Sequence, residues 1–222
     1  MKRILLLYIP IIFLFACEKN DSSDNSDLSK ILWQDYIYST VQIGDQLWFA
    51  ENCRYLPNVS PSKEISLTEP ICYVYNYEGT VVAEAQSHEN YNTYGVLYNW
   101  AAVQLESICP PGWHIPTDED WTELTDYLGG AGVAGGKMKE SGYEHWDDTN
   151  TGGSNTSGFT GLPAGYADGY FDGESWVAVW WSSSTTNSES SAWKRNVYSN
   201  STELIRKDHP GDYGFSCRCI KD

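Results

Sequence analysis

Apolar and polar positions along the chain predict a fold built from short strands and short helices. Residues 36–56 alternate between apolar and polar side chains on either side of Gly44-Asp45, which indicates two strands joined by a two-residue hairpin turn. Residues 57–70 predict a loop, and residues 71–79 a short strand. Val96, Trp100 and Val103 stand near helical spacing, so a short helix is expected within 94–105.

The stretch "CPPGWHIPTDEDWTELTDYLGG" (109–130) predicts a turn followed by a second helix. Thr117 is a favourable N-cap, and Asp120 stands where a capping box needs an acceptor. Acids in the first turn favour the positive end of the helix dipole. Gly129-Gly130 ends the helix, whose apolar face consists of Trp121, Leu124, Thr125 and Leu128. The acids therefore have structural roles, and His114 is interpreted as a core or turn histidine.

Beyond residue 150 the sequence is rich in Gly, Ser, Asn and Tyr and predicts further strands. They are expected at 176–184, 191–199, 203–207 and 214–222. Two short helices followed by several short antiparallel strands indicate an α+β domain.

The N-terminal residues resemble a lipoprotein signal peptide (1–16). Lys2 and Arg3 precede an apolar run, residues 4–15, that is shorter than the roughly 20 residues a membrane span needs. Leu14-Phe15-Ala16-Cys17 resembles a lipobox, in which Cys17 is the lipidated first residue; an ordinary cleaved signal is the alternative. Residues 17–30 are polar and acidic and predict a flexible tether, which leaves 31–222 as one domain.

These features predict an outer membrane lipoprotein, held at the membrane by its lipid anchor. The acidic residues after Cys17 resemble a surface-export signal, although a plain periplasm-facing linker remains open. The full chain has 14 basic and 30 acidic residues, and loss of Lys2 and Arg3 brings the net charge to −18. A nucleic-acid partner is not expected, because phosphate binding requires clustered Lys and Arg.

No motif predicts catalysis, a cofactor or a metal site. The four histidines show neither HxH nor HxxxH spacing, and no GxSxG or P-loop occurs. Calcium binding by the acids in residues 147–155 is left open as an alternative. Cys217-Arg218-Cys219 has the spacing of a redox or copper motif, which is the less favoured interpretation. We therefore expect a protein that is not an enzyme.

Six ordered blocks of sequence resemble the Fibrobacter-type major paralogous domain (FISUMP). They are "VQIGDQLWFAENCRYLP", "YGVLYNWAAV", the 109–130 stretch, "GFTGLPAGY", "WWSSS" and "GFSCRCIKD", and together they extend over about residues 36–222. The family occurs in secreted bacterial lipoproteins, and its biochemical role is largely undefined. The resemblance implies a C-type-lectin-like fold, distantly related to that of the formylglycine-generating oxidase.

The resemblance also implies disulfide pairs among the five cysteines that follow Cys17. The usual family pair corresponds to Cys109 with Cys219. Family members usually carry apolar residues at the positions of Cys53 and Cys217, so two cysteines there suggest a second bridge. A Cys53–Cys72 bridge is the alternative to that pair.

The C-terminal strands carry the candidate binding residues. Lys194, Asn196 and Tyr198 share one face of the strand at 191–199, and Trp193, Arg195 and Val197 share the other. Tyr, Asn and Ser are common in binding surfaces. We expect an extracellular glycan or protein ligand, bound by Tyr170, Trp176, Asn187, Lys194, Asn196, Tyr198 and His209. The alternatives are a solvated sheet face without a ligand, a structural role in the cell envelope, and an oxidase relative.

Overall fold

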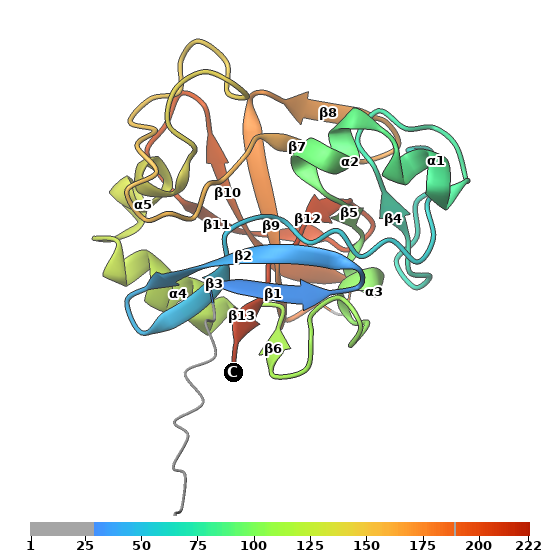
Figure 1. The fold of residues 1–222 in the computed structure, drawn as a ribbon, viewed down its shortest axis with the longest axis horizontal. Coiled ribbons are helices and arrows are strands. Elements are labelled where there is room, and N and C mark those ends of the chain that lie inside the picture. Colours follow the sequence, from blue (N-terminus) through green and yellow to red (C-terminus); the bar gives the residue numbers. More distant parts are fainter. Residues whose placement is uncertain (1–28, 189) are drawn as a thin grey trace, which may run out of the picture.

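The computed structural model describes residues 29–188 and 190–222, which form an α+β structure (Figure 1). The predicted signal peptide, the lipidation site Cys17 and nearly all of the tether lie outside the described residues. Lys30, assigned to the tether from the sequence, is already the first residue of strand β1 (Lys30–Trp33). None of the helices in the described ranges has the length and apolar character needed to cross a membrane.

A five-stranded sheet joins the two ends of the domain, in the order β1-β2-β3-β13-β6. Its other strands are β2 (Tyr36–Ile43), β3 (Gln46–Phe49), β6 (Trp113–His114) and β13 (Ile220–Lys221). The predicted hairpin is confirmed, since only Gly44 and Asp45 separate β2 from β3 and Ile43 pairs with Gln46. Near the C-terminus, Ile220 pairs with both Trp48 and His114.

The six-stranded sheet has the order β11-β10-β9-β12-β5-β4. Its strands are β4 (Cys72–Tyr73), β5 (Leu97–Tyr98), β9 (Val177–Thr185), β10 (Ser191–Tyr198), β11 (Ile205–Pro210) and β12 (Phe215–Ser216). A separate hairpin consists of β7 (Ala164–Ala167) and β8 (Phe171–Glu174). Figure 1 shows β1, β2 and β3, in blue, in front of the orange and red strands of this sheet.

Helices α4 (Asp118–Tyr127) and α5 (Ala131–Met138) cover one face of β9 and β10. Ala178 and Trp180 of β9 pack with the apolar side chains of these helices. Val177, Val179 and Trp181 alternate to the opposite face and belong to a second core. The remaining helices are α1 (Val82–Gln86), α2 (Glu89–Tyr94) and α3 (Trp100–Val103).

The sequence predicted the position of most strands and the start of α4. Thr117 accepts a hydrogen bond from the Asp120 amide and Asp120 reciprocates, so the capping box is confirmed. Other elements differ. The strand expected in 71–79 is only β4, and 214–222 divides into β12 and β13. The helix expected in 94–105 is limited to α3, and the prediction is wrong for Leu97–Tyr98, which form strand β5. Helices α1, α2 and α5 and the β7–β8 hairpin were not predicted.

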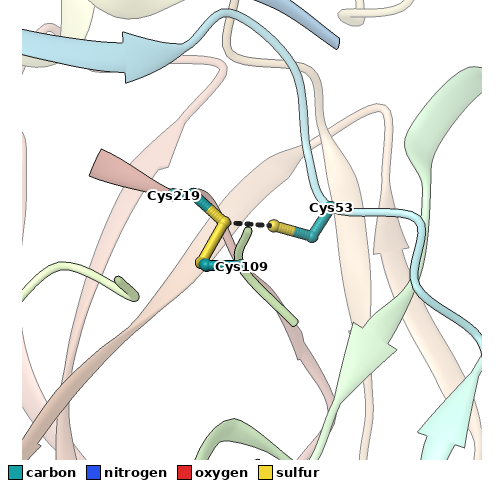
Figure 2. Close-up of side chains that lie close together, drawn as sticks. All are labelled: Cys53, Cys109 and Cys219. Atoms are coloured by element: carbon teal, nitrogen blue, oxygen red, sulfur yellow. Dashed lines mark hydrogen bonds between the residues drawn. A yellow bond between two sulfur atoms is a disulfide. The ribbon is translucent and has the colours of Figure 1, made fainter. Parts of the chain in front are cut away.

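One disulfide links Cys109 to Cys219 across 110 residues of sequence, as the family resemblance implied. The expected Cys53–Cys217 bridge is wrong, because both residues are free, buried thiols, as is Cys72. The backbones of Cys53 and Cys217 are hydrogen-bonded neighbours, with the Cys53 amide donating to the Cys217 carbonyl at 2.9 Å. The Cys53 sulfur, however, is directed at Cys219 and lies 3.5 Å from its Sγ (Figure 2).

The disulfide is expected to stabilise the fold by restricting the unfolded chain. Replacing both Cys109 and Cys219 with alanine should lower the free energy of unfolding by about 4 kcal/mol, since the closed loop is long. Cys53→Ala is the matched control: it removes a buried sulfur from the same cluster and no crosslink, and should cost about 1–2 kcal/mol. Urea unfolding measures both values, and equal losses would contradict a stabilising bridge.

Candidate functional site

Strand β10 presents chemically different faces to the two sides of the six-stranded sheet. On the helix side, Arg195 donates a hydrogen bond to Asp118 at 2.8 Å, and Val197 packs in the core beneath α4 and α5. On the other side, Lys194, Asn196 and Tyr198 line a cavity of about 490 Å³. This alternation follows from the two-residue period of a strand. The polar face of β10 is therefore directed into a concavity.

The cavity has a floor formed by three neighbouring strands and a wall of aromatic side chains. The floor consists of Val177 and Val179 from β9, Lys194, Asn196 and Tyr198 from β10, and Ile205, Lys207 and His209 from β11. The wall consists of Tyr166, Asp168, Trp176, Tyr213 and Phe215. Cavities of roughly 300–1,000 Å³ with apolar walls and a few convergent polar groups are typical of small-ligand sites.

Lys194 is a buried cation without a counter-charge in the described residues. The residue is only 7% exposed. Its ammonium donates to Asn196 Oδ1 at 2.7 Å and lies 5.5 Å from the centre of the Phe215 ring. No described carboxylate forms an ion pair with it, and its cross-strand neighbour on β11 is Lys207. Burial, reinforced by the charge of Lys207, lowers the pKa of Lys194 to about 8.

Other buried cations of the described chain have fuller sets of partners. Lys139 donates to the carbonyl oxygens of Tyr198 and Ser199 at 3.1 and 2.9 Å. Arg195 pairs with Asp118. Arg218 donates to several acceptors, namely Asn52 Oδ1 and the carbonyl oxygens of Phe49, Phe159 and Thr160. Because burying a poorly paired charge is costly, the environment of Lys194 does not serve stability.

Three further polar atoms of the cavity-lining residues are buried without a described partner. They are Asn196 Nδ2, His209 Nδ1 and Asp168 Oδ1. The orientation of the Asn196 amide follows from its neighbour, since an ammonium can only donate and so fixes the amide oxygen toward Lys194. Its NH₂ group is then left as an unused donor. Such groups are rare in folded proteins because each costs about 1–3 kcal/mol.

Aromatic rings surround these polar atoms. The Trp176 and Tyr198 rings lie 4.8 Å apart, and Trp176 is 45% exposed at the mouth of the cavity. His209 contacts Tyr213 at 4.1 Å and Phe215 at 5.3 Å between ring centroids. Burial, with the charge of Lys194 as the second cause, lowers the pKa of His209 to about 4. His209 is therefore a neutral hydrogen-bonding group at neutral pH.

Five of the seven predicted binding residues line this cavity: Trp176, Lys194, Asn196, Tyr198 and His209. Lys194 and Asn196 lie on the cavity floor with 7% and 1% of their surface exposed, so the expectation of an open, solvent-exposed sheet face was wrong. Tyr170 lies in the β7–β8 turn, where its carbonyl accepts from the Asp168 amide, and it does not line the cavity.

Asn187 is not part of the cavity. It lines a separate hollow that includes Trp193 and Asp208. Trp193 belongs to the opposite face of β10, where its ring lies 3.4 Å from the Arg206 guanidinium. Asn187 was selected for its residue type, which does not indicate the side of the sheet that a loop approaches.

Several wall residues were missed by sequence reasoning, chiefly Tyr166, Asp168, Tyr213 and Phe215. They come from β7, β12 and the adjoining turns, which pack beside β9 only through long-range contacts. The alternation of residues 205, 207 and 209 along β11 could have predicted that Lys207 lies on the same face as His209. No sequence pattern could have predicted the wall residues.

Asp118 and Asp120 of the 109–130 stretch have structural roles, as predicted. Asp120 accepts from Thr117 and lies 3.1 Å from His114 Nε2, while Asp222 lies 2.6 Å from His114 Nδ1. The hydrogen bond with Asp120, the largest cause, raises the pKa of His114. Asp118 joins the arginines Arg195 and Arg206. Hydrogen bonds and ion pairs of this stretch therefore link α4 to β6 and β10.

Two other clusters contain potential metal ligands. Cys53, Cys109 and Cys219 lie together in the core (Figure 2), but two of the three sulfurs form the disulfide. Burial raises the pKa of the Cys53 thiol and keeps it protonated and unreactive. Glu140, Glu144 and His145 form the second cluster, in which Glu140 already binds His145 Nδ1 at 2.9 Å. In residues 147–155, Asp147 accepts from Thr149 and Ser199.

The depressed pKa of Lys194 predicts a pH-dependent cost of its burial. The unfolded chain holds the proton more tightly than the folded chain, so the stability contributed at this position rises as pH increases from 8 toward 10.5. The unfolding free energy of the native protein, minus that of Lys194→Met, should rise by up to about 3 kcal/mol over this range. Urea unfolding at several pH values measures the difference, and a constant difference would show that the ammonium is hydrated.

Comparison with known protein families identifies a family model that matches most of the chain. The family model of the Fibrobacter succinogenes major domain matches residues 41–221, which include every element from β3 to β13 and the whole cavity. No curated protein and no solved structure matches the chain. Since the matched region covers most of the chain, the protein belongs to the Fibrobacter succinogenes major domain family.

Proposed function

We propose that this protein is a non-enzymatic, surface-displayed lipoprotein that binds an extracellular ligand in the cavity on β9, β10 and β11. The observation that carries the proposal is the gathering of unsatisfied polar groups in one aromatic-walled cavity. Lys194, Asn196 and His209 come from adjacent positions of two paired strands, and each has hydrogen-bonding capacity that no described residue uses.

A ligand accounts for this arrangement better than a structural role does. A face selected for stability would carry apolar side chains at 194 and 196, because a buried ion and a buried amide gain little from incomplete pairing. Lys194 and Lys207 are also direct cross-strand neighbours, and like charges in that position repel. Bound ligand atoms would satisfy the donors and offset the repulsion.

The shape of the cavity favours a compact ligand group over a flat protein surface. Its volume of about 490 Å³ suits one or two sugar residues, and Trp176 and Tyr198 offer ring faces on which a sugar can pack. A glycan end is therefore the proposed ligand. A protein ligand would need to insert a protruding side chain to reach Lys194.

The remaining parts of the proposal rest on the sequence. A signal peptide over 1–16, lipid attachment at Cys17 and a tether over 17–30 would display the domain on the outer membrane. A C-type-lectin-like arrangement is proposed for the domain, in agreement with its mixed sheets and short helices. The net acidic charge argues against nucleic acid as a partner.

Removing aromatic side chains from the cavity should abolish ligand capture without unfolding the protein. The full chain, displayed on phospholipid nanodiscs, is to be tested on a glycan array and on whole cells. Trp176→Ala and Tyr198→Ala should each reduce capture at least tenfold, because about 1.4 kcal/mol of lost contact corresponds to that factor.

Trp193→Ala is the matched control, since it removes the same type of ring from the opposite face of β10. It should retain capture, and all three variants should keep melting temperatures close to that of the unmodified protein. Equal loss of capture in Trp176→Ala and Trp193→Ala, or no capture by the unmodified protein, would contradict the proposed site.

A further inference from the structure

We infer that the ligand of this cavity is a sugar acid whose carboxylate docks against Lys194. The inference rests on the proposed function and adds the chemical class of the ligand. Three features carry it: an unpaired buried cation with adjacent donors, an acceptor on the facing wall, and aromatic rings around both.

The donors are concentrated on the floor of the cavity. The ammonium of Lys194 has used one of its three hydrogens on Asn196 Oδ1, and the Asn196 NH₂ beside it has no described partner. Lys207 adds a second positive charge from the adjacent strand. A carboxylate has two oxygens that accept from such a pair of donors, and its negative charge is attracted by both lysines. Neutral hydroxyl groups would leave the buried charge uncompensated.

The wall of the cavity supplies a hydrogen-bond acceptor. Asp168 contributes an oxygen, Oδ1, that is buried and without a described partner. Burial raises the pKa of Asp168, while a hydrogen bond from Tyr213 opposes that rise. Asp168 forms no ion pair with Lys194, so the cation and the carboxylate remain available to different parts of one ligand.

A sugar acid fits this distribution of groups. Its carboxylate would meet Lys194 and Asn196, its ring hydroxyls would donate to Asp168, and the apolar face of its ring would pack on the aromatic wall. An α-amino acid offers the same carboxylate and an ammonium for Asp168, yet it lacks the ring face and the several hydroxyls. The breadth of the aromatic lining, from Trp176 to Tyr213, favours the sugar acid.

Binding should weaken as Lys194 loses its proton. The groups around its ammonium are Asn196 on its own strand, Lys207 and His209 on β11, and Phe215 on β12. Two carboxyl groups lie farther away: Asp168 belongs to the cavity wall, and Asp212 to the loop after β11. His209 stays neutral above pH 6, because its pKa is lowered to about 4 by burial first and by Lys194 second. A fall in affinity between pH 7 and 9.5 therefore reports on Lys194.

Isothermal titration calorimetry of the full chain in nanodiscs tests the inference with matched sugars. D-glucuronate and D-galacturonate are compared with D-glucose and D-galactose, which have the same rings with a hydroxymethyl group in place of the carboxylate. The uronates should bind at least tenfold more tightly at pH 7, and this preference should shrink at least tenfold by pH 9.5. Lys194→Met should remove the preference, whereas Lys207→Met should only reduce it.

The outcomes separate this inference from the proposed function. Suppose that uronates and neutral sugars bind equally, that Lys194→Met does not change this binding, and that Trp176→Ala abolishes it. This result would support the proposed binding site and overturn the sugar-acid inference. Tighter binding of glycine or glutamate than of either uronate would also overturn it. Absence of binding to all these probes, together with a negative glycan array and negative whole-cell capture, would overturn both.

Discussion

The antiparallel pairing of β9, β10 and β11 is the constraint on which the rest of the structure depends. Once Asn196 is opposite Val179 on one side and Ile205 on the other, every side chain of β10 is assigned to a face. Arg195 must then meet Asp118 at the start of α4, and Val197 must enter the core. The same register directs Lys194, Asn196 and Tyr198 to the opposite side. A shift by one residue would exchange the two sets.

The two faces of this sheet differ in how completely their charged and polar groups are paired. Beneath α4 and α5 the arginines share a carboxylate partner, since Asp118 forms ion pairs with both Arg195 and Arg206. On the cavity side, Lys194 faces Lys207, and the neighbouring amide is only half used. Marginally stable proteins can keep such costly groups where they serve binding. The contrast between the two faces of one strand supports the proposed binding site more strongly than either face does alone.

The sequence predicted the local features well because their causes are local. The capping box of α4 needs only Thr117 and Asp120, and the β2–β3 hairpin needs only its two turn residues and the flanking alternation. The polar face of β10 was also predictable from its two-residue period. The choice of Lys194, Asn196 and Tyr198 followed directly from that period.

What could not be predicted depends on contacts between distant segments. Tyr166 and Phe215 reach the cavity because β7 and β12 pack beside β9, and no local pattern encodes that proximity. The same applies to burial, since a lysine in an alternating strand is normally exposed until a wall is built beside it. Cys53 shows the limit most clearly: its backbone adjoins Cys217, as the expected pair required, yet its sulfur is directed at Cys219.

The most direct test of the account is an NMR titration of the Lys194 side chain, with its Cε resonance assigned by loss of signal in Lys194→Met. The central claim is that the fold holds this ammonium away from water without a counter-charge. The account predicts a pKa of about 8 in the protein without ligand, and a rise when glucuronate is added. An ordinary lysine pKa that glucuronate does not change would contradict it.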